Sequence, residues 1–350
     1  MKAARTDWIT VMNKRPRIHV ISETAFFIQG QGVHTAFLDC VNLLRHDVDV
    51  IVNEAGWGDL MHAHTYGPYY FWKGRRYRGR RVFTAHVIPD SIKGSLPLWP
   101  IFMPLVRWYL RQVYSYADVC IAISPTVKEA IQGLKANTRI VQIYNPIDAD
   151  RFSPSLELRA ATRKKLGFSE DAFVVLGVGQ LERRKGVEDF LAISEACPHM
   201  RFVWAGGRPF GIMTEGVARL NKRIRSAEGR VRFLGLLPLE DMLAIYNAAD
   251  LFLFPSYQEN CPLAPLEAAA SGLPVIYRDI PEYVDLYNNP YLKARDTEEF
   301  IALTKRMAED TDFYSEGRLI SSRLLTQFDK KTIRGQLMRL YKEILEGWTG

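Results

Sequence analysis

Two glutamates eight positions apart, Glu259 and Glu267, have the chemistry and the placement to bind a polyhydroxylated ligand. They lie in FPSYQENCPLAPLEAAASGLPVIYRDIPEY, a pattern that predicts a strand, a loop and then a helix opening around Pro262. Glu259 could accept hydrogen bonds from sugar hydroxyls, and Glu267 from both hydroxyls of a ribose. On spacing alone, two glutamates that merely complement the helix dipole are an equally good interpretation.

The start of the same predicted helix offers backbone donors to an anion. The first turn of a helix leaves N–H groups without intrahelical partners, and the positive end of the dipole lies there. Pro262 has no N–H but suits the first turn. The groups that could face a diphosphate are the backbone N–H groups of Asn260, Cys261 and Leu263.

Short apolar runs that alternate with helical stretches must position these residues. In the first half, strands are predicted at residues 17–22, 48–52, 60–64, 82–86 and 119–124, with a helix at 33–45. In the second half they are predicted at 173–179, 202–205, 231–234, 251–255 and 274–277. This alternation is typical of the α/β class, with parallel sheets wound by helices on both faces.

The length of 350 residues suits two domains. The polar, turn-rich segment 146–168 is interpreted as a linker. We therefore predict an N-terminal domain at 1–150 and a C-terminal domain at 151–350, with a last helix that could cross back to the first. Two doubly wound domains should bind their ligand in a cleft at the carboxyl ends of both sheets.

The stretch around the two glutamates resembles the donor-binding segment of family-4 glycosyltransferases of the GT-B fold. That family is marked by two glutamates separated by seven residues before a small-Gly-x-Pro-Val turn. The resemblance runs from Arg17 to about Leu340. It implies two Rossmann-like domains, a nucleotide-sugar on the C-terminal domain and an acceptor on the N-terminal one, with Glu259 on the donor sugar and Glu267 on the ribose. RDIPEY and PSYQEN are most similar to bacterial members that glucosylate diacylglycerol or monoglycosyl-diacylglycerol.

A second segment, GVGQLERRKG (177–186), resembles the family's Gly-Arg-Leu…Lys-Gly motif. The resemblance implies that Lys185 binds the donor diphosphate, a task suited to a compact ammonium group. Gln180 stands at the donor-binding position where the family usually has arginine, so one cation is missing there. Arg183 or Arg184 could compensate, but a solvated basic loop is the favoured interpretation of these two.

Two features of the first half also resemble the family. Gly30 and Gly32 match a glycine-rich, donor-binding loop after the first strand, where glycine permits close approach of the backbone to a phosphate or to the acceptor, although glycines also simply make turns. His86 ends the strand in FTAH and matches the histidine beside the reacting sugar carbon. The resemblance therefore implies that His86 is catalytic together with Glu259, its carbonyl and ring helping to hold the donor sugar.

No metal or other cofactor is expected, because the nucleotide-sugar is a substrate. His19, His34, His46 and His199 have no metal-ligand spacing. The Asp-x-Asp strings at 47–49 and 148–150 lead into a strand and lie in the predicted linker, respectively, and the resemblance implies a fold that needs no metal. His62 and His64 end the strand before that of His86; we interpret them as core residues, with an acceptor contact by one of them as the alternative.

Most of the net charge of +7 belongs to the first half. Residues 1–150 carry 18 Lys+Arg and 12 Asp+Glu, a balance of +6, against 28 and 27, or +1, in the remainder. A localised excess suggests an anionic partner such as a membrane surface. Six of these basic residues cluster in KGRRYRGRR: Lys73, Arg75, Arg76, Arg78, Arg80 and Arg81.

A helix predicted from Pro104 follows this basic cluster. Leu105, Trp108, Tyr109 and Val113 should lie near one side of it, with Arg107 and Arg111 beside them. Aromatic residues flanked by arginines are typical of an interfacial helix on anionic lipid, where each basic group contributes about 1 kcal/mol. A solvated basic loop followed by an ordinary core helix is the alternative. Nucleic acid is a third possibility, but no motif for it is present.

Composition excludes several classes of protein. With 47% hydrophobic and 24% charged residues, the chain is an ordinary globular protein without a spanning apolar run or a signal-peptide pattern. Its four cysteines are scattered, which argues against a disulfide framework. We expect a cytoplasmic protein, peripheral on the inner face of the cell membrane.

The sequence thus predicts a retaining hexosyltransferase that uses UDP-glucose or UDP-galactose, with a membrane glycolipid as acceptor. A soluble, polysaccharide or polyprenyl acceptor remains an alternative, as do a sugar-nucleotide epimerase and a non-catalytic protein that binds a nucleotide-sugar or a membrane. A Rossmann oxidoreductase is disfavoured, because Gly30-Gln31-Gly32 is followed by Thr35 where the dinucleotide fingerprint requires glycine.

Overall fold

The computed structural model describes residues 15–24, 32–92, 99–207 and 217–347. By packing, the chain divides into two units. The first comprises residues 1–89, 102–146 and 330–350, and the second comprises residues 90–101 and 147–329. The first unit thus takes in the last helix as well as most of the predicted N-terminal domain.

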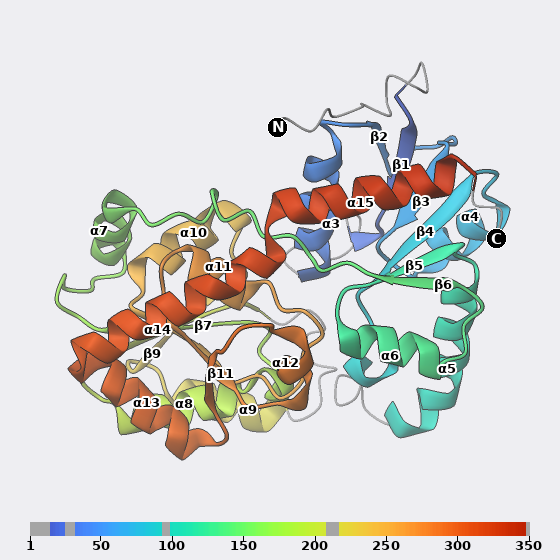
Figure 1. The fold of residues 1–350 in the computed structure, drawn as a ribbon. Helices are drawn as coiled ribbons and strands as arrows, with labels where there is room; N and C mark the ends of the chain where they lie inside the picture. The colour runs from blue at the N-terminus through green and yellow to red at the C-terminus, as the bar shows by residue number, and fades with distance from the viewer. Residues whose placement is uncertain (1–14, 25–31, 93–98, 208–216, 348–350) are drawn as a thin grey trace. The chain divides into compact units, whose positions relative to one another are not determined.

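The first unit is built on a parallel sheet of six strands in the order β2-β1-β3-β4-β5-β6 (Figure 1). The strands are β1 (Arg17–Ile21), β2 (Asp49–Val52), β3 (Leu60–Ala63), β4 (Arg80–Ala85), β5 (Val119–Ala122) and β6 (Arg139–Gln142). β3 and β5 are buried along their whole length. Burial on both faces explains why these strands are near-continuous apolar runs in the sequence.

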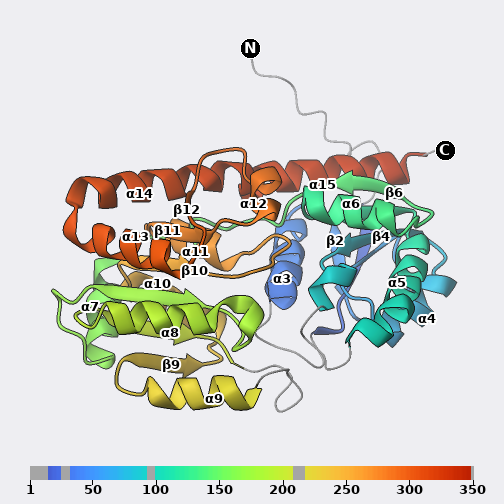
Figure 2. The ribbon, with the colours of Figure 1, turned by 90° about the horizontal axis from the view of Figure 1, so that it is seen from below.

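Helices cover this sheet. They are α3 (Gly32–Leu44), α4 (Pro68–Arg76), α5 (Trp99–Ser115), α6 (Pro125–Gly133) and α15 (Lys330–Leu345). Apart from Pro89, the 3-10 turn η1 (Pro89–Ile92) and the first residues of α5 belong to the second unit by packing. The C-terminal helix α15 packs beside α3 (Figures 1 and 2). One apolar core joins both helices to the sheet, with Phe37 from α3, Leu337 from α15 and Leu60 from β3. This core fixes the last helix of the chain to the first unit.

The second unit has its own parallel sheet, in the order β12-β11-β10-β7-β8-β9. The strands are β7 (Val174–Val178), β8 (Arg201–Ala205), β9 (Val231–Gly235), β10 (Leu251–Phe254), β11 (Val275–Arg278) and β12 (Leu292–Ala294). The strand order reverses between the neighbours β7 and β10. Such a switch point is where doubly wound sheets bind ligands, beyond the carboxyl ends of the strands.

Helices flank the second sheet, and α8, α9 and α13 lie on one face of it (Figures 1 and 2). The elements are α7 (Leu156–Lys165), η2 (Arg183–Lys185), α8 (Val187–Ala196), α9 (Val217–Ser226), α10 (Leu239–Ala248), α11 (Ala264–Ala270), α12 (Pro281–Leu286), α13 (Thr297–Glu309), α14 (Thr311–Leu324) and η4 (Leu325–Phe328). Side-chain caps begin several of them; the Asp310 carboxylate, for example, accepts the Phe313 N–H at the start of α14.

The predicted α/β architecture is confirmed, with three corrections. The edge strands β6 and β12 were not predicted, because β6 is only half-buried and β12 has three residues, so neither has an apolar run. The predicted linker 146–168 contains α7, whose Arg163 is fully buried against Asp250 at 2.5 Å. Helix α5 begins at Trp99, and Pro104 lies inside it. Among the described residues, no helix is long and apolar enough to cross a membrane.

Candidate functional site

The two glutamates lie where β10 ends, in the second unit. β10 ends at Phe254, a loop follows, and α11 begins at Ala264. The predicted start around Pro262 is therefore wrong: Pro265, rather than Pro262, lies in the first turn, and so does Glu267. The backbone N–H groups of Asn260, Cys261 and Leu263 belong to the loop and the cap that precede the helix.

Glu259 is paired with Lys185, which the chain brings from the separate turn η2. The Lys185 ammonium donates to Oε1 of Glu259 at 2.5 Å, and the Ser256 hydroxyl donates to the same oxygen at 2.6 Å. Burial alone raises the pKa of Glu259, but the charges of Lys185 and Arg184 and these hydrogen bonds bring that pKa below its ordinary value. Burial lowers the pKa of Lys185, and Glu259 opposes this shift. The pair is thus a buried cation beside a buried anion.

Glu267 has a different partner. The hydroxyl of Tyr246, on α10, donates to its Oε2 at 2.7 Å, and both side chains are buried. Burial, and next the Glu267 carboxylate, raises the pKa of Tyr246 well above its ordinary value, so the phenol stays protonated as a donor. Glu267 is therefore held in one orientation at the start of α11.

Arg278, at the end of β11, stabilises the loop that carries Glu259. Its Nε donates to the carbonyl of Pro255 at 2.9 Å, and its guanidinium lies 3.9 Å from the Tyr257 ring centroid and 3.1 Å from the Asp189 carboxylate. The Tyr257 hydroxyl also donates to Asp189, at 2.9 Å. Asp189 could not be recognised from the sequence as part of this site, because its partners Tyr257 and Arg278 come from distant segments.

The basic residues of η2 differ in their contacts. Arg184 donates to the Gln258 carbonyl at 3.0 Å and so braces the same loop. Arg183 is 66% exposed and lies 3.4 Å from Glu188, as a solvated side chain would. Gln180 is half-buried after β7, and its carbonyl accepts the N–H of Glu182. Diphosphate binding by Lys185 or Gln180 remains a prediction.

Among the described residues, the remaining ones predicted to contact the donor lie in the loop before α11 and near the start of α3. Asn260 donates from its side chain to the Ser91 hydroxyl at 3.0 Å. The side chains of Cys261 and Leu263 are buried, so only their backbone groups are suited to a polar ligand. Gly32 opens α3 and is exposed, whereas Gly30 lies outside the described residues.

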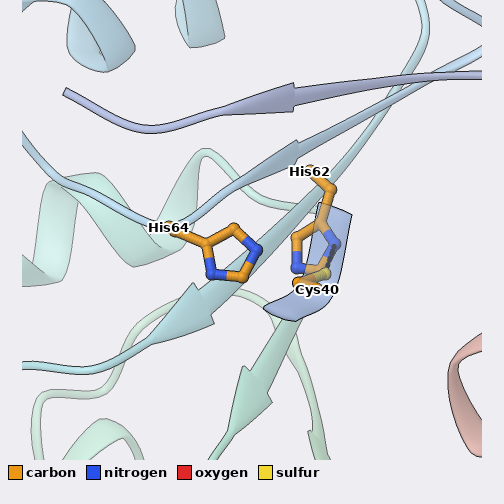
Figure 3. A group of neighbouring side chains, drawn as sticks. All are labelled: Cys40, His62 and His64. Atoms are coloured by element: carbon orange, nitrogen blue, oxygen red, sulfur yellow. Dashed lines mark hydrogen bonds between the residues drawn. The ribbon is translucent and has the colours of Figure 1, made fainter. Parts of the chain in front are cut away.

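In the first unit, three histidines gather at the carboxyl ends of β3 and β4. His62 and His64 lie on the same face of the chain because side chains two apart in a strand point the same way. Nδ1 of His64 is 3.1 Å from Nε2 of His86. The His62 ring lies beside that of His64, with Cys40 of α3 next to it (Figure 3). The sequence His62-Ala63-His64 could have indicated this cluster, because it places two histidines on one face of a strand.

Cys40, His62 and His64 place possible metal-ligand atoms within 4.8 Å of one another. Hydrogen bonds already engage both ring nitrogens of His62, with the Tyr341 hydroxyl at 2.5 Å and with the Thr84 hydroxyl at 2.6 Å. Burial raises the pKa of the Cys40 thiol to about 12, so its metal-binding thiolate form is disfavoured. The cluster as built is therefore a hydrogen-bonded group rather than a set of converging ligands.

The basic cluster extends over the end of α4 and the start of β4, and its members are not equally available. Arg75, Arg76, Arg78 and Arg80 are exposed. Lys73 donates to the Glu54 carbonyl at 3.0 Å, and Arg81 pairs with Asp118 and donates to the Gly74 carbonyl. Arg75, Arg76 and Arg78 lie instead over aromatic rings, with their guanidinium carbons 5.2–5.9 Å from the ring centroids.

Helix α5 has an exposed apolar face that differs from the predicted one. Val113 is fully buried, and Tyr109 donates from its hydroxyl to the Tyr66 carbonyl. Leu105 and Trp108 are exposed, at 62% and 56%, as are Ile101 and Phe102 near the start of the helix. We call Phe102, Leu105 and Trp108 the α5 apolar face. Within the described part of the chain, no other element covers these three side chains.

Comparisons with known proteins identify the family of the chain. The family described as "Glycosyltransferase Family 4" matches residues 36–151, and that described as "Glycosyl transferases group 1" matches residues 172–310. The alpha-galactosylglucosyldiacylglycerol synthase of Streptococcus pneumoniae is 31% identical, over 84% of this chain and 80% of its own length. The processive diacylglycerol alpha-glucosyltransferase of Acholeplasma laidlawii is 26% identical, over 76% and 79%.

Solved structures share the fold. HepE of Anabaena, in complex with UDP and glucose, superposes with a TM-score of 0.75 at 19% identity, over 94% of this chain and 100% of that chain. Sucrose-phosphate synthase of Thermosynechococcus elongatus superposes with a TM-score of 0.73 at 18% identity, over 95% and 100%. At such identities the likeness shows the arrangement of strands and helices alone.

Proposed function

Because the chain belongs to the family-4 glycosyltransferases, we propose that it transfers a hexose from UDP-glucose or UDP-galactose to a membrane glycolipid, with retention at the sugar carbon. The chain is a hexosyltransferase of the GT-B fold. The proposal for the acceptor draws on the two relatives named for diacylglycerol-based glycolipids, and that for the donor on HepE with UDP and glucose.

One observation carries the proposal for the donor: Lys185 and Glu259 meet as a buried ion pair beside the carboxyl end of β10. Glu259 accepts hydrogen bonds from the hexose hydroxyls, and Lys185 faces the diphosphate. Glu267, oriented by Tyr246, accepts from the ribose hydroxyls. When the donor binds, its hydroxyls and phosphates replace part of the contact that the two charges make with each other.

In the reaction the bond between the sugar carbon and the diphosphate oxygen breaks, a bond from that carbon to the acceptor oxygen forms on the same face, and the proton of the acceptor hydroxyl passes to the leaving diphosphate. Positive charge develops on the sugar ring and negative charge on the leaving diphosphate. Lys185 stabilises that negative charge in a site with little water, where a fixed cation acts most strongly. No metal ion is required for this role. In the first unit, His86 helps to hold the donor sugar.

The α5 apolar face and the exposed arginines near α4 support a peripheral position on anionic lipid. Leu105 and Trp108 present apolar area to solvent, and Arg107 and Arg111 are exposed on the same helix. Apolar side chains enter the headgroup boundary while basic groups attract anionic lipids. We infer that the enzyme binds reversibly to the inner face of the cell membrane, where its acceptor lies.

The test is to incubate the protein with labelled UDP-glucose, UDP-galactose or GDP-mannose and anionic vesicles that contain diacylglycerol or a monoglycosyl-diacylglycerol. We expect label from one UDP-hexose in the lipid fraction. Label only in water-soluble products would reject the lipid acceptor, and conversion of the donor without acceptor would indicate an epimerase. Glu259→Ala should abolish transfer, whereas Glu240→Ala, at a largely exposed position, should not.

A further inference from the structure

Two histidines from neighbouring strands meet edge to edge in the first unit. β3 and β4 are parallel partners, with Ala63 opposite Phe83, so His64 and His86 both emerge at the same edge of the sheet. Nδ1 of His64 lies 3.1 Å from Nε2 of His86, and the ring planes differ by 23°. Only 3% of His64 and 8% of His86 are exposed. A hydrogen bond within a site this buried has a defined donor and a defined acceptor.

We propose that His64 is a positioning residue for His86: its Nδ1–H donates to Nε2 of His86 and thereby fixes the orientation and the tautomer of that ring. His86 then carries its own hydrogen at Nδ1, so this ring nitrogen is a hydrogen-bond donor and not a base. The importance of this for catalysis rests on the proposed function, which places His86 beside the donor sugar. The hydrogen bond itself does not depend on that function.

Both rings are neutral. Burial lowers the pKa of His86 to about 4, and burial together with the neighbouring rings of His62 and His86 lowers the pKa of His64 well below its ordinary value. One hydrogen therefore lies between Nδ1 of His64 and Nε2 of His86. The nitrogen that carries this hydrogen determines the tautomer of both rings.

The other nitrogen of His64 identifies the donor. Its Nε2 is buried and has no hydrogen-bond partner among the described residues. If His64 accepted from His86, its hydrogen would sit on Nε2 as a buried N–H without an acceptor, an arrangement that folded proteins rarely contain. If His64 donates through Nδ1, only a lone pair is left without a partner. Donation from Nδ1 of His64 to His86 is therefore the arrangement of lower free energy.

A rigid support holds His64 in place. The ring centroid of His62 is 4.5 Å from that of His64, and His62 is itself held at both nitrogens, by Tyr341 of α15 and by Thr84 of β4. A metal bound by Cys40, His62 and His64 would have to break one of those bonds and remove the Cys40 proton. The positioning role needs no such change.

The direct test reads the tautomers without any assay of activity. In protein labelled with ¹⁵N-histidine, long-range ¹H–¹⁵N spectra distinguish a protonated from an unprotonated ring nitrogen. We expect His86 protonated at Nδ1 and bare at Nε2. In His64→Leu, His86 should shift towards the Nε2–H tautomer; in His64→Asn, whose amide can donate from nearly the same place, it should stay. His46→Asn, at an exposed position, is the matched control.

Three results would overturn the proposal: a wild-type His86 protonated at Nε2, no change of tautomer in His64→Leu, or stoichiometric binding of added Zn²⁺ that shifts the His64 signals. If His64→Leu does not fold, the wild-type spectrum and the His64→Asn variant still decide the question.

The activity test follows once transfer from a UDP-hexose is measured. His64→Leu should lower kcat by about tenfold or more, because a misplaced group loses orientation, while the KM for the donor changes less than about twofold. His64→Asn should recover most of the loss. Equal loss of kcat in both variants at unchanged melting temperature would reject the positioning role. If the wild-type protein transfers no sugar, the proposed function fails while the NMR result stands.

Discussion

The ammonium nitrogen of Lys185 lies 2.5 Å from Oε1 of Glu259, across 74 positions of sequence, and both side chains are largely buried. Each residue alone would carry an unfavourable buried charge. Together they form a pair that also receives the Ser256 hydroxyl. The contribution of this pair to the stability of the protein can be measured.

Glu259→Gln should destabilise the protein although it preserves the shape of the side chain. The substitution leaves the buried Lys185 without its counter-charge, and breaking such a pair costs about 3 kcal/mol of unfolding free energy. Urea titration at neutral pH measures the loss. Glu343→Gln is the matched control, because Glu343 pairs with Arg139 at the surface; its loss should be much smaller. Equal losses would show that the Lys185–Glu259 pair is screened by water.

Acid should remove the difference in unfolding free energy between the wild-type protein and Glu259→Gln. The pKa of Glu259 is lowered from 4.5 in the folded protein, so its contribution to stability is present above the unfolded pKa and is lost as pH falls through the folded pKa. Unfolding free energies measured from pH 7 down to pH 3 should therefore converge for the two proteins. A gap that stays constant over this range would contradict the lowered pKa.

Tyr246→Phe should raise the KM for the UDP-hexose and lower the unfolding free energy by about 1–2 kcal/mol, because Glu267 loses a buried donor. Tyr283→Phe is the control. Tyr283 is equally buried in the same unit, but its hydroxyl has no hydrogen-bond partner in the described part of the chain. Its removal should be neutral or slightly stabilising. Similar effects of the two variants on KM would argue against a role of Tyr246 in orienting Glu267.

Gly186→Ala should be more destabilising than Gly167→Ala by about 2 kcal/mol. Both glycines have positive φ, 70° and 66°, so an alanine is strained at either position. Only at Gly186 would the new Cβ also meet another segment, 2.2 Å from the Pro255 carbonyl oxygen; nothing lies within 4 Å at Gly167. Thermal unfolding compares them. Gly186→Ala should in addition weaken UDP binding, since it displaces the loop that leads to Glu259.

The double variant Leu105→Ser and Trp108→Ser should bind vesicles of anionic lipid at least about tenfold more weakly, because it removes two apolar side chains from the α5 apolar face. Leu156→Ser is the control: Leu156 is 86% exposed, in the second unit. Co-sedimentation with vesicles measures both. Unchanged vesicle binding by the double variant would show that α5 does not contact lipid. Transfer to a water-soluble acceptor, measured without vesicles, should stay as in wild type.

The apolar runs of the sequence predicted ten of the twelve described strands: the eight inner strands, which are buried on both faces, and the edge strands β2 and β9. The edge strands β6 and β12 were not predicted, because β6 is only half-buried and β12 has three residues, so neither has a clear apolar run. Helix α7 was not predicted either, because its sequence is polar. Its stability comes from the contacts of Arg159 and Arg163 with Asp250, which lies more than 80 residues away in the sequence.

By itself, the sequence determined the family, the fold class and the residue types at the proposed donor site, because these depend on local pattern: two glutamates, a lysine before a glycine, a histidine at a strand end. Only the tertiary structure decided the partners. Glu259 meets Lys185 and His64 meets His86 because parallel strands bring their carboxyl ends to one edge, whereas Glu267 of α11 meets Tyr246 of α10 through a contact between two helices. Spacing along the chain cannot specify such contacts, since the packing of whole elements sets the distances.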